Sequence, residues 1–438
     1  MKKFLAMILA LVMVLAMVSV ASAEDAMRVA MITDYGDITD QSFNQTTYEA
    51  CKKWAEENGV DFTYFKPAGD STPERVAMVE KAAEEGYNVI VMPGYAFGGT
   101  IAEVQNDYSD IKFVALDVSE GDLGGVELAS NVYCAVYQEE LCGYMAGYAA
   151  VKLGYTHLGF LGGMAVPAVV RYGYGFVQGC NAAAVEMGKE KEVTVEYVYG
   201  NQFFGDADIT AYMDNWYQTM GVQAVFACGG GIYTSAAEAA AKVNAKVIGV
   251  DVDQAGIINA YGEGMTVTSA MKGLAATVNT LLTEIKAGNF ASFGGKVETL
   301  GLVSGTDMDA NYVGIPASTQ YAEGFTAEDY AALVAKMFAG EVTVSNDTET
   351  QPEVALTVTY YGNSKYFHHR RGEAISPAFD KSPCSRKRSG GFCQGPCQAN
   401  RPRKGGTNSL ENHGNEYAVE MLHITKRFPG IVANDDIT

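Results

Sequence analysis

Histidine is scarce in the main part of this sequence. His157 is the one histidine before residue 365, and the other four follow that position. A GxxxxGK[ST] phosphate-binding loop is also missing, because Gly295-Lys296-Val297 has neither the spacing nor the hydroxyl. A nucleophilic triad or a zinc site therefore has few possible members, and the composition favours a binding protein over an enzyme. We expect no catalytic residue, no metal site and no cofactor.

Cysteine shows no clustering. None of the cysteines of the main body has the paired spacing of a metal site. They stand singly in apolar surroundings, as Cys51, Cys134, Cys142, Cys180 and Cys228. We expect buried free thiols that pack as small hydrophobic side chains. A disulfide such as Cys134–Cys142 is the alternative.

Basic side chains are too few to balance the acidic ones. The chain has 31 Lys and Arg against 52 Asp and Glu, a net charge of −21. Residues 365–438 hold 12 of the basic and 7 of the acidic residues, which leaves 19 and 45 for residues 1–364. A body this acidic avoids nucleic acid and anionic lipid surfaces, so we expect no nucleic-acid partner.

Long hydrophobic runs are missing except at the N-terminus. Met1-Lys2-Lys3 is followed by the apolar run Phe4–Val20 and the small residues Ala21-Ser22-Ala23. This order predicts a secretory signal peptide, residues 1–23, with Glu24 beginning the mature chain. A retained membrane anchor is the alternative. We expect a protein that works outside the cytoplasmic membrane, secreted or at the cell surface.

Short apolar strands alternate with helices through the body, beginning with strand Arg28–Thr33 and helix Phe43–Asn58. Nearly continuous apolar strands are typical of parallel sheets that helices cover on both faces. We predict an α/β protein with two parallel-sheet lobes and a ligand in the cleft between them. The first lobe is expected to span residues 24–145 with part of 265–310, and the second residues 146–264 with part of 311–350.

Polar or glycine-rich residues follow most of the expected strands. The carboxyl ends of parallel strands meet at one edge of a sheet, so these residues should gather around one crevice. They are Asp34-Tyr35-Gly36, Pro93-Gly94-Tyr95, Asp117, Gly162-Gly163-Met164, Cys228-Gly229-Gly230-Gly231, Asp251-Val252-Asp253 and Met271-Lys272. Glycine-rich turns also occur for steric reasons alone, but so many in succession favour a binding site.

The first of these segments, Asp34–Gln45, leads into a helix that should start near Ser42. A helix N-terminus beside a strand end is where open α/β sheets bind ligands. The segment contributes three aspartates, an amide and two rings: Asp34, Asp37, Asp40, Asn44, Tyr35 and Phe43. Such an acidic rim suits a hydroxyl-rich or amine-bearing ligand and repels phosphate. A solvated loop capped by Asp40 or Ser42 is the alternative.

Five segments share a family pattern: DITDQSFNQ, GFLGGMAVPAVVRYGYGFVQG (Gly159–Gly179), VFACGGG (Val225–Gly231), VIGVDVDQ (Val247–Gln254) and GGKVETLGL (Gly294–Leu302). They resemble the basic-membrane-protein family, substrate-binding proteins of ABC importers that include bacterial purine-nucleoside receptors. The resemblance implies a type I periplasmic-binding-protein fold with a hinge, and a nucleoside ligand, best attested for purines. It also implies ABC permease subunits in the membrane as partners. We expect a monomer.

The resemblance implies roles for single residues as well. Those reading the base edge would be Asp40, Asn44 and Asp117. Those binding ribose hydroxyls would be Gly230 or Gly231, Asp251 or Asp253, and Lys272. The rings stacking on the base would be Tyr35 and either Phe203 or Phe204, since this sequence has two aromatic residues where the family has one.

Other interpretations of these residues stay open. Lys272 could be a surface lysine at a helix start, and Asp253 a helix cap. Arg171 is expected to pair with an acid of its own lobe, and His157 to be structural. The same fold could bind a sugar or a signalling molecule, and a nucleoside hydrolase would also use an aspartate cluster, such as Asp37, Asp40, Asp251 and Asp253.

Two features depart from the family. Its members are commonly lipoproteins with a cysteine just after the signal, whereas Ala23 is followed by Glu24.

Residues 365–438 lose the hydrophobic periodicity, and Glu416–Thr438 resembles the opening strands of an importer's ATP-binding subunit. We interpret this tail as the product of a frameshift near residue 364 that runs into a downstream gene, and as a disordered segment rather than a functional domain.

Overall fold

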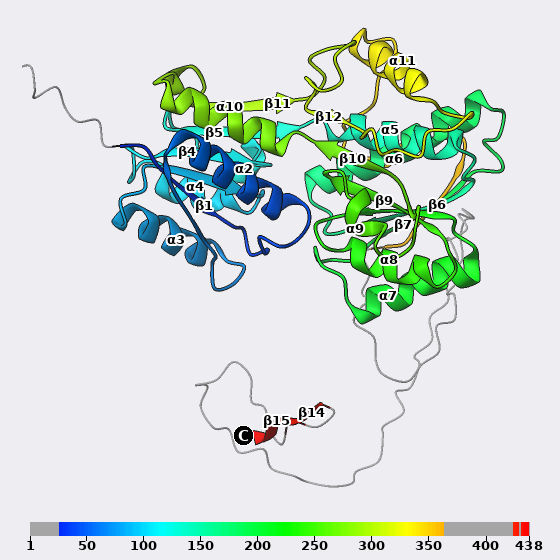
Figure 1. Cartoon of the computed structure of the whole chain (residues 1–438), viewed down its shortest axis with the longest axis horizontal. Helices are drawn as coiled ribbons and strands as arrows, with labels where there is room; N and C mark the ends of the chain where they lie inside the picture. The colour runs from blue at the N-terminus through cyan, green and yellow to red at the C-terminus, as the bar shows by residue number, and fades with distance from the viewer. Residues whose placement is uncertain (1–25, 363–423, 429–430, 438) are drawn as a thin grey trace, which may run out of the picture. The chain divides into compact units, whose positions relative to one another are not determined.

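The computed structural model describes residues 26–362 and, as strands, residues 424–428 and 431–437 (Figure 1). The predicted signal peptide and most of the basic tail lie outside these residues. β14 (Ile424–Phe428) and β15 (Ile431–Ile437) pair as an antiparallel hairpin, in a unit separate from the main body. None of the helices among the described residues combines the length and apolar character that a membrane span needs.

The first lobe contains a six-stranded sheet in the order β11-β5-β4-β3-β1-β2, in which all neighbours are parallel. Helix α10 packs against α2, and α3 packs against α4 (Figure 1). The elements of this lobe are β1 (Arg28–Ile32), α2 (Phe43–Asn58), β2 (Asp61–Phe65), α3 (Thr72–Glu84), β3 (Val89–Pro93), α4 (Phe97–Val104), β4 (Lys112–Leu116), η1 (Glu120–Leu123), β5 (Val132–Tyr137), α10 (Leu274–Lys286), η3 (Phe290–Ser292) and β11 (Lys296–Leu300).

The second lobe contains a seven-stranded sheet in the order β12-β10-β9-β8-β6-β7-β13. Its neighbours are parallel except for the antiparallel pair of β10 and β12. The elements are α5 (Glu139–Lys152), β6 (His157–Gly162), α6 (Pro167–Glu186), β7 (Thr194–Tyr199), α7 (Ala207–Asp214), η2 (Asn215–Met220), β8 (Ala224–Cys228), α8 (Tyr233–Ala241), β9 (Lys246–Asp251), α9 (Ala255–Ile258), β10 (Thr266–Lys272), β12 (Val313–Gly314), α11 (Ala327–Phe338) and β13 (Thr357–Tyr360).

The described chain passes between the two sheets at three places, which form the hinge. These crossovers join β5 to α5, β10 to α10, and β11 to β12. The strands nearest the centre of each sheet are apolar because helices cover both of their faces. All five residues of β3 and of β8 are buried, for example. The predicted α/β fold with two parallel-sheet lobes is therefore confirmed.

Several elements differ from the sequence predictions. We predict a helix from Tyr137 to Leu153 and no strand before it, but residues 132–137 form β5 and α5 begins at Glu139. Only Gln138 separates this strand from the helix, and no glycine or proline marks the boundary, so the strand is easily merged with the helix. No prediction covers β11 or β13, which are half-exposed edge strands with a weak apolar pattern.

The five cysteines of the body are free and buried. The prediction of buried thiols is therefore confirmed, and the alternative disulfide Cys134–Cys142 is absent from the structure.

Candidate ligand-binding site

A cavity of about 370 Å³ lies between the two lobes. Its wall comes from loops at the carboxyl ends of strands in both sheets, together with the first turns of α2 and α6. The lining residues are Asp34, Tyr35, Gly36, Asp37, Thr39, Asp40, Phe43, Asn44, Lys66, Gly94, Tyr95, Asp117, Val166, Ala168, Val169, Tyr172, Phe203, Phe204, Cys228, Gly229, Gly230, Gly231, Val250, Asp251 and Lys272.

Ten of the eleven predicted site residues line this cavity. They are Tyr35, Asp40, Asn44, Asp117, Phe203, Phe204, Gly230, Gly231, Asp251 and Lys272. The structure does not bring Asp253 to the cavity: its carboxylate accepts the Ala255 N–H at 3.0 Å and the Ser318 hydroxyl at 2.8 Å. Asp253 instead holds the start of α9, where Gln254 is the N-cap residue. Of the two aspartates, Asp251 is the one that lines the cavity.

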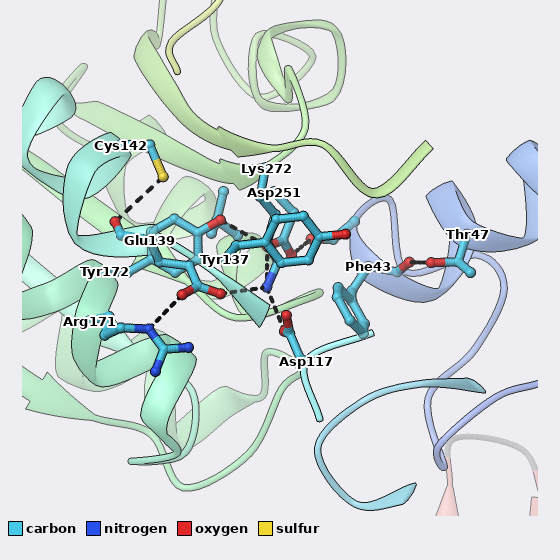
Figure 2. Close-up of polar contacts among 12 residues, drawn as sticks. Phe43, Thr47, Asp117, Tyr137, Glu139, Cys142, Arg171, Tyr172, Asp251 and Lys272 are labelled. Atoms are coloured by element: carbon cyan, nitrogen blue, oxygen red, sulfur yellow. Dashed lines mark hydrogen bonds and ion pairs between the residues drawn. The ribbon is translucent and has the colours of Figure 1, made fainter. Parts of the chain in front are cut away.

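Lys272 sits in a buried cluster of carboxylates at the hinge (Figure 2). Its Nζ lies 2.5 Å from Asp117 Oδ2, 3.4 Å from Glu139 Oε1 and 3.8 Å from Asp251 Oδ1. The Lys272 side chain is 3% exposed, so the interpretation as a surface lysine is wrong. Glu139 receives a second cation, because Arg171 Nε donates to its Oε2 at 2.7 Å. The expected pairing of Arg171 with an acid of its own lobe is thereby confirmed.

Aromatic rings enclose the same ammonium group. The Nζ of Lys272 lies 4.8 Å from the ring centre of Phe43, 5.4 Å from that of Tyr137 and 5.6 Å from that of Tyr172 (Figure 2). Burial by itself lowers the pKa of Lys272, but the carboxylates of Asp117, Glu139 and Asp251 outweigh it and hold the pKa above its usual value. Lys272 is therefore a permanent cation that offers donors at the cavity wall.

Two of the three carboxylates around Lys272, those of Asp117 and Asp251, stand at strand ends and have an unusual backbone conformation. Asp117 has φ +60° and Asp251 has φ +64°, a left-handed conformation that aspartate tolerates better than most residues. Asp251 also accepts the Ser42 hydroxyl at 2.6 Å and the Tyr172 hydroxyl at 3.3 Å. Burial raises the pKa of Asp251, and Lys272 counteracts that rise.

A second polar group surrounds the start of α2. Asn44 Nδ2 donates to Asp34 Oδ1 and to Asp40 Oδ2, both at 3.2 Å. Asp40 also accepts the backbone N–H groups of Ser42, Asn44 and Gln45 at 2.9 to 3.1 Å. Asp40 therefore caps the helix as well as lining the cavity. Burial raises the pKa of Asp34, and it raises the pKa of Asp40 to about 6.

Two acceptor oxygens at the cavity wall have no donor among the described residues. They are Asn44 Oδ1 and Asp117 Oδ1, and both are buried. A buried acceptor without a donor costs about 1–3 kcal/mol, so such atoms call for an explanation. A ligand with hydroxyl or N–H groups would supply the missing donors.

The two adjacent phenylalanines play different structural parts. A Cβ added to Gly163 would lie 2.4 Å from Cδ1 of the Phe203 ring. The position of this ring therefore requires glycine at residue 163. Phe204 is 55% exposed although its residue lines the cavity. Phe203 therefore packs partly against the lobe, and Phe204 is the more exposed of the two rings.

Sequence analysis did not assign several of these residues to the site. Phe43 and Asp34 belong to the first segment, Asp34–Gln45, but of the two rings in that segment only Tyr35 is predicted to stack on the base. Tyr172 and Glu139 lie on helices, outside the strand ends that directed the search. The signal that could have found Glu139 is an acidic pair, Glu139-Glu140, at the start of an otherwise apolar helix.

Sequence comparison decides the family. The profile of the family described as "ABC transporter substrate-binding protein PnrA-like" (Bmp) matches residues 27–327. The chain belongs to this family. The predicted resemblance is therefore confirmed, and it covers most of the described body.

Relatives and solved structures agree. The "ABC transporter nucleoside-binding protein BmpA" of Lactococcus lactis is 26% identical over 298 residues, 64% of this chain and 80% of that protein. "Basic membrane protein B" of Borreliella burgdorferi is 25% identical over 308 residues, 69% of this chain and 84% of that protein. An ABC transporter solute-binding protein from Conexibacter woesei has the same fold, with a TM-score of 0.57 and 22% identity over 73% of this chain and 99% of that chain.

Family membership establishes the general role. The protein is a solute-binding component of an ABC transporter, with a small-molecule ligand and permease subunits as partners. Its family consists of binding proteins rather than enzymes. Among the described residues, no group of three or more His, Cys, Asp or Glu side chains is placed to hold a metal ion.

Proposed function

We propose that this protein binds nucleosides, purine nucleosides foremost, in the interlobe cavity and delivers them to an ABC permease outside the cytoplasmic membrane. The observation that carries the proposal is the pairing of two kinds of group in one cavity. Buried acceptors without donors stand at its wall, and the exposed ring of Phe204 lines it. A flat base with N–H donors, joined to a sugar with hydroxyl groups, satisfies both.

The ribose is assigned to the cluster around Lys272. A sugar hydroxyl both donates and accepts, and this cluster offers an ammonium donor beside the carboxylates of Asp117 and Asp251. Asp117 contacts Lys272 directly, so we move it from the expected base readers to the ribose subsite. Gly230 and Gly231 line the same cavity, and their backbone is open to a close approach of the sugar.

The base edge is assigned to the polar group at the start of α2. Asn44 and the carboxyls of Asp34 and Asp40 lie within one hydrogen-bonded group, and all three line the cavity. Amide and carboxyl groups of this kind recognise the N–H and carbonyl groups of a purine. The ring above the base is assigned to Phe204, and that below it to Phe43 or Tyr35.

Stacking and hydrogen bonding together reach a useful affinity. Each stacked ring contributes about 1–3 kcal/mol, and each hydrogen bond to a charged group about 1.5–3 kcal/mol. A micromolar dissociation constant requires about 8 kcal/mol after the costs of association are met. Two rings (about 2–6 kcal/mol) and three or four hydrogen bonds (about 4.5–12 kcal/mol) together reach this value, whereas the two rings alone fall short.

The charge of the cavity argues against phosphorylated ligands. The acidic lining residues outnumber the basic ones: Asp34, Asp37, Asp40, Asp117 and Asp251 face Lys66 and Lys272. Lys66 already pairs with Asp37 at 2.9 Å, and Lys272 is committed to its carboxylates. A phosphate would find no uncommitted cation among the described lining residues, so nucleotides should bind at least tenfold more weakly than nucleosides.

Isothermal titration calorimetry tests the proposal. The purified protein is titrated with adenosine, guanosine, guanosine 5′-monophosphate, ribose and galactose. We expect micromolar or tighter binding of a purine nucleoside and weak binding of the monophosphate and the sugars. Phe204→Ala should weaken nucleoside binding at least fivefold, whereas Phe338→Ala, which removes an equally exposed ring outside the cavity, should not. Preferential binding of galactose or ribose would favour the sugar alternative, and release of free base would favour a hydrolase.

The predictions for the ends of the chain and for its division also stand as proposals. They are the signal peptide 1–23, the lobe ranges 24–145 and 146–264, whose boundary α5 (Glu139–Lys152) moves to about residue 138, and the frameshift origin of the tail 365–438. Intact-mass measurement of the natural protein tests the first and the last. A mature species that extends to Thr438 would contradict the frameshift.

A further inference from the structure

The motif VIGVDVDQ ends in a residue that the ligand site leaves unexplained. Gln254 is 1% exposed and does not line the cavity. Its side chain is nevertheless held at both ends: Oε1 accepts the Val250 N–H at 2.9 Å, and Nε2 donates to the backbone oxygen of Gln41 at 3.0 Å. Gln41 belongs to the first lobe and Gln254 to the second, so this amide joins the two lobes.

The local sequence makes room for this side chain. A Cβ on Gly249 would lie 2.9 Å from Gln254 Cβ and from its Oε1, so glycine lets the glutamine pack against the strand. Gln41 has φ +56°, which is uncommon for a residue other than glycine. Its N–H donates to Gln45 Oε1 at 3.0 Å, and its carbonyl accepts Gln254. The unusual conformation is thus held from both sides.

A second hydrogen bond joins the lobes beside the first. The hydroxyl of Ser42, in the first lobe, donates to Asp251 Oδ2, in the second, at 2.6 Å. Ser42 is fully buried and precedes α2, yet its side chain caps no N–H of that helix. Its hydroxyl therefore serves the bond to Asp251. Ser42, like Gln41, does not line the ligand cavity.

We propose that Gln41, Ser42, Asp251 and Gln254 form an interlobe clasp that holds the lobes closed from the hinge side. Gln254 and Ser42 are positioning residues: they act on the start of α2, which carries Phe43 and Asn44, rather than on the ligand. The clasp lies beside a crossover, because Asp251 is the register partner of Met271 in β10. It rests on the proposed function only in taking the interlobe cavity as the ligand site, and it holds for any ligand.

The clasp predicts how closure and binding are linked. Each hydrogen bond shifts the ratio of closed to open molecules on the order of fivefold, and a bond to a carboxylate shifts it more. A ligand that needs the closed form binds more weakly when the closed fraction falls, in proportion to that fraction, and most of such a loss of affinity shows as faster dissociation. Gln41, Ser42 and Gln254 therefore influence the dwell time of the ligand without lining the cavity.

Lobe closure is measured by energy transfer between two dyes in the ligand-free protein. The dyes are attached at the exposed positions Lys53 of α2 and Lys191 beyond α6, as Lys53→Cys and Lys191→Cys. The five cysteines of the described body are buried, and Cys384, Cys393 and Cys397, which lie outside the described residues, are replaced by serine in every variant. The test variants are Ser42→Ala and Gln254→Met. The matched control is Thr268→Val, which removes a buried hydrogen bond to Thr319 (2.7 Å) within the second lobe.

We expect the ratio of closed to open molecules to fall on the order of fivefold in each test variant and to stay unchanged in the control. Gln254→Glu provides the rescue: burial at this position favours the neutral carboxyl, which keeps one acceptor and one donor. At pH 5 its ratio should therefore match that of the wild type measured at the same pH. Equal ratios in the wild type, Ser42→Ala and Gln254→Met would overturn the clasp. So would a Gln254→Glu variant at pH 5 that is as open as Gln254→Met, because side-chain shape rather than hydrogen bonding would then be responsible.

This measurement is independent of the ligand's identity. If no nucleoside binds but the ligand-free ratio responds to Ser42→Ala and Gln254→Met, the proposed function fails and the clasp stands. If guanosine binds and its dissociation rate does not change in these variants, the clasp fails and the proposed function stands.

Discussion

Replacing Lys272 by methionine is the sharpest perturbation that the structure offers. The change keeps the length and apolar stem of the side chain and removes the ammonium group. Three carboxylates then lose their shared cation, whose nearest contact is 2.5 Å, and Arg171 offsets Glu139 alone. Removing one partner of a buried ion pair costs about 3–5 kcal/mol, because the remaining charge stays buried and uncompensated. We expect a loss of this size in the free energy of unfolding at pH 7.5.

The pH dependence identifies the cause. Burial raises the pKa values of Glu139 and Asp251 above their usual range, and Lys272 counteracts that rise. Lys272→Met should therefore raise both pKa values further. A group with a raised pKa in the folded state contributes stability that is present at low pH and lost as the pH rises through that pKa. The deficit of the variant should accordingly shrink between pH 7.5 and pH 5.

Urea unfolding followed by circular dichroism measures this deficit at both pH values. Lys242→Met is the matched control, because Lys242 and Asp214 also pair at 2.7 Å but their side chains are 48% and 28% exposed. An exposed pair is worth at most about 1 kcal/mol. The reasoning is refuted if Lys272→Met costs no more than Lys242→Met, or if its deficit is the same at pH 5 as at pH 7.5.

Three further predictions concern the cavity wall. Phe203→Ala should lower the free energy of unfolding by about 1–3 kcal/mol, because the ring is partly buried, whereas Phe204→Ala should leave urea unfolding unchanged and weaken only nucleoside binding; equal stability losses would contradict the assignment. Gly163→Ala should lower the urea midpoint because its Cβ would meet Phe203 Cδ1 at 2.4 Å, and combining it with Phe203→Ala should cost less than the sum of the single changes. Burial raises the pKa of Asp40 to about 6, above the usual value of about 3.9, so its ionisation removes stability as the pH rises from about 4 to 6. Asp40→Asn should flatten that part of the stability profile, and an unaltered profile would show that Asp40 is not the group responsible.

The strand-end rule accounts for most of what sequence analysis found. Asp117, Gly230, Gly231 and Lys272 follow apolar strands, and parallel sheets bring such ends to one edge. The rule failed for Asp253, which stands two residues beyond the strand end and turns toward α9. It could not distinguish Asp251 from Asp253, because that choice depends on the left-handed backbone at Asp251.

Groups that act through tertiary contacts were beyond the reach of sequence patterns. Glu139 lies at the start of α5, and only the hinge crossover brings it to Lys272. Gln254 and Ser42 are buried polar residues, but their partners are 213 and 209 residues away in the sequence. The edge strands β11 and β13 were missed for a related reason: they depend on a neighbouring strand rather than on an apolar pattern of their own.

A crystal structure of the protein with guanosine tests the central claim most directly. We predict a nucleoside between the lobes, with its base stacked on Phe204 and its ribose hydroxyls within hydrogen-bonding distance of Lys272 and Asp117 or Asp251. A cavity that stays empty at saturating guanosine, or a nucleoside whose ribose lies away from Lys272, would contradict the account.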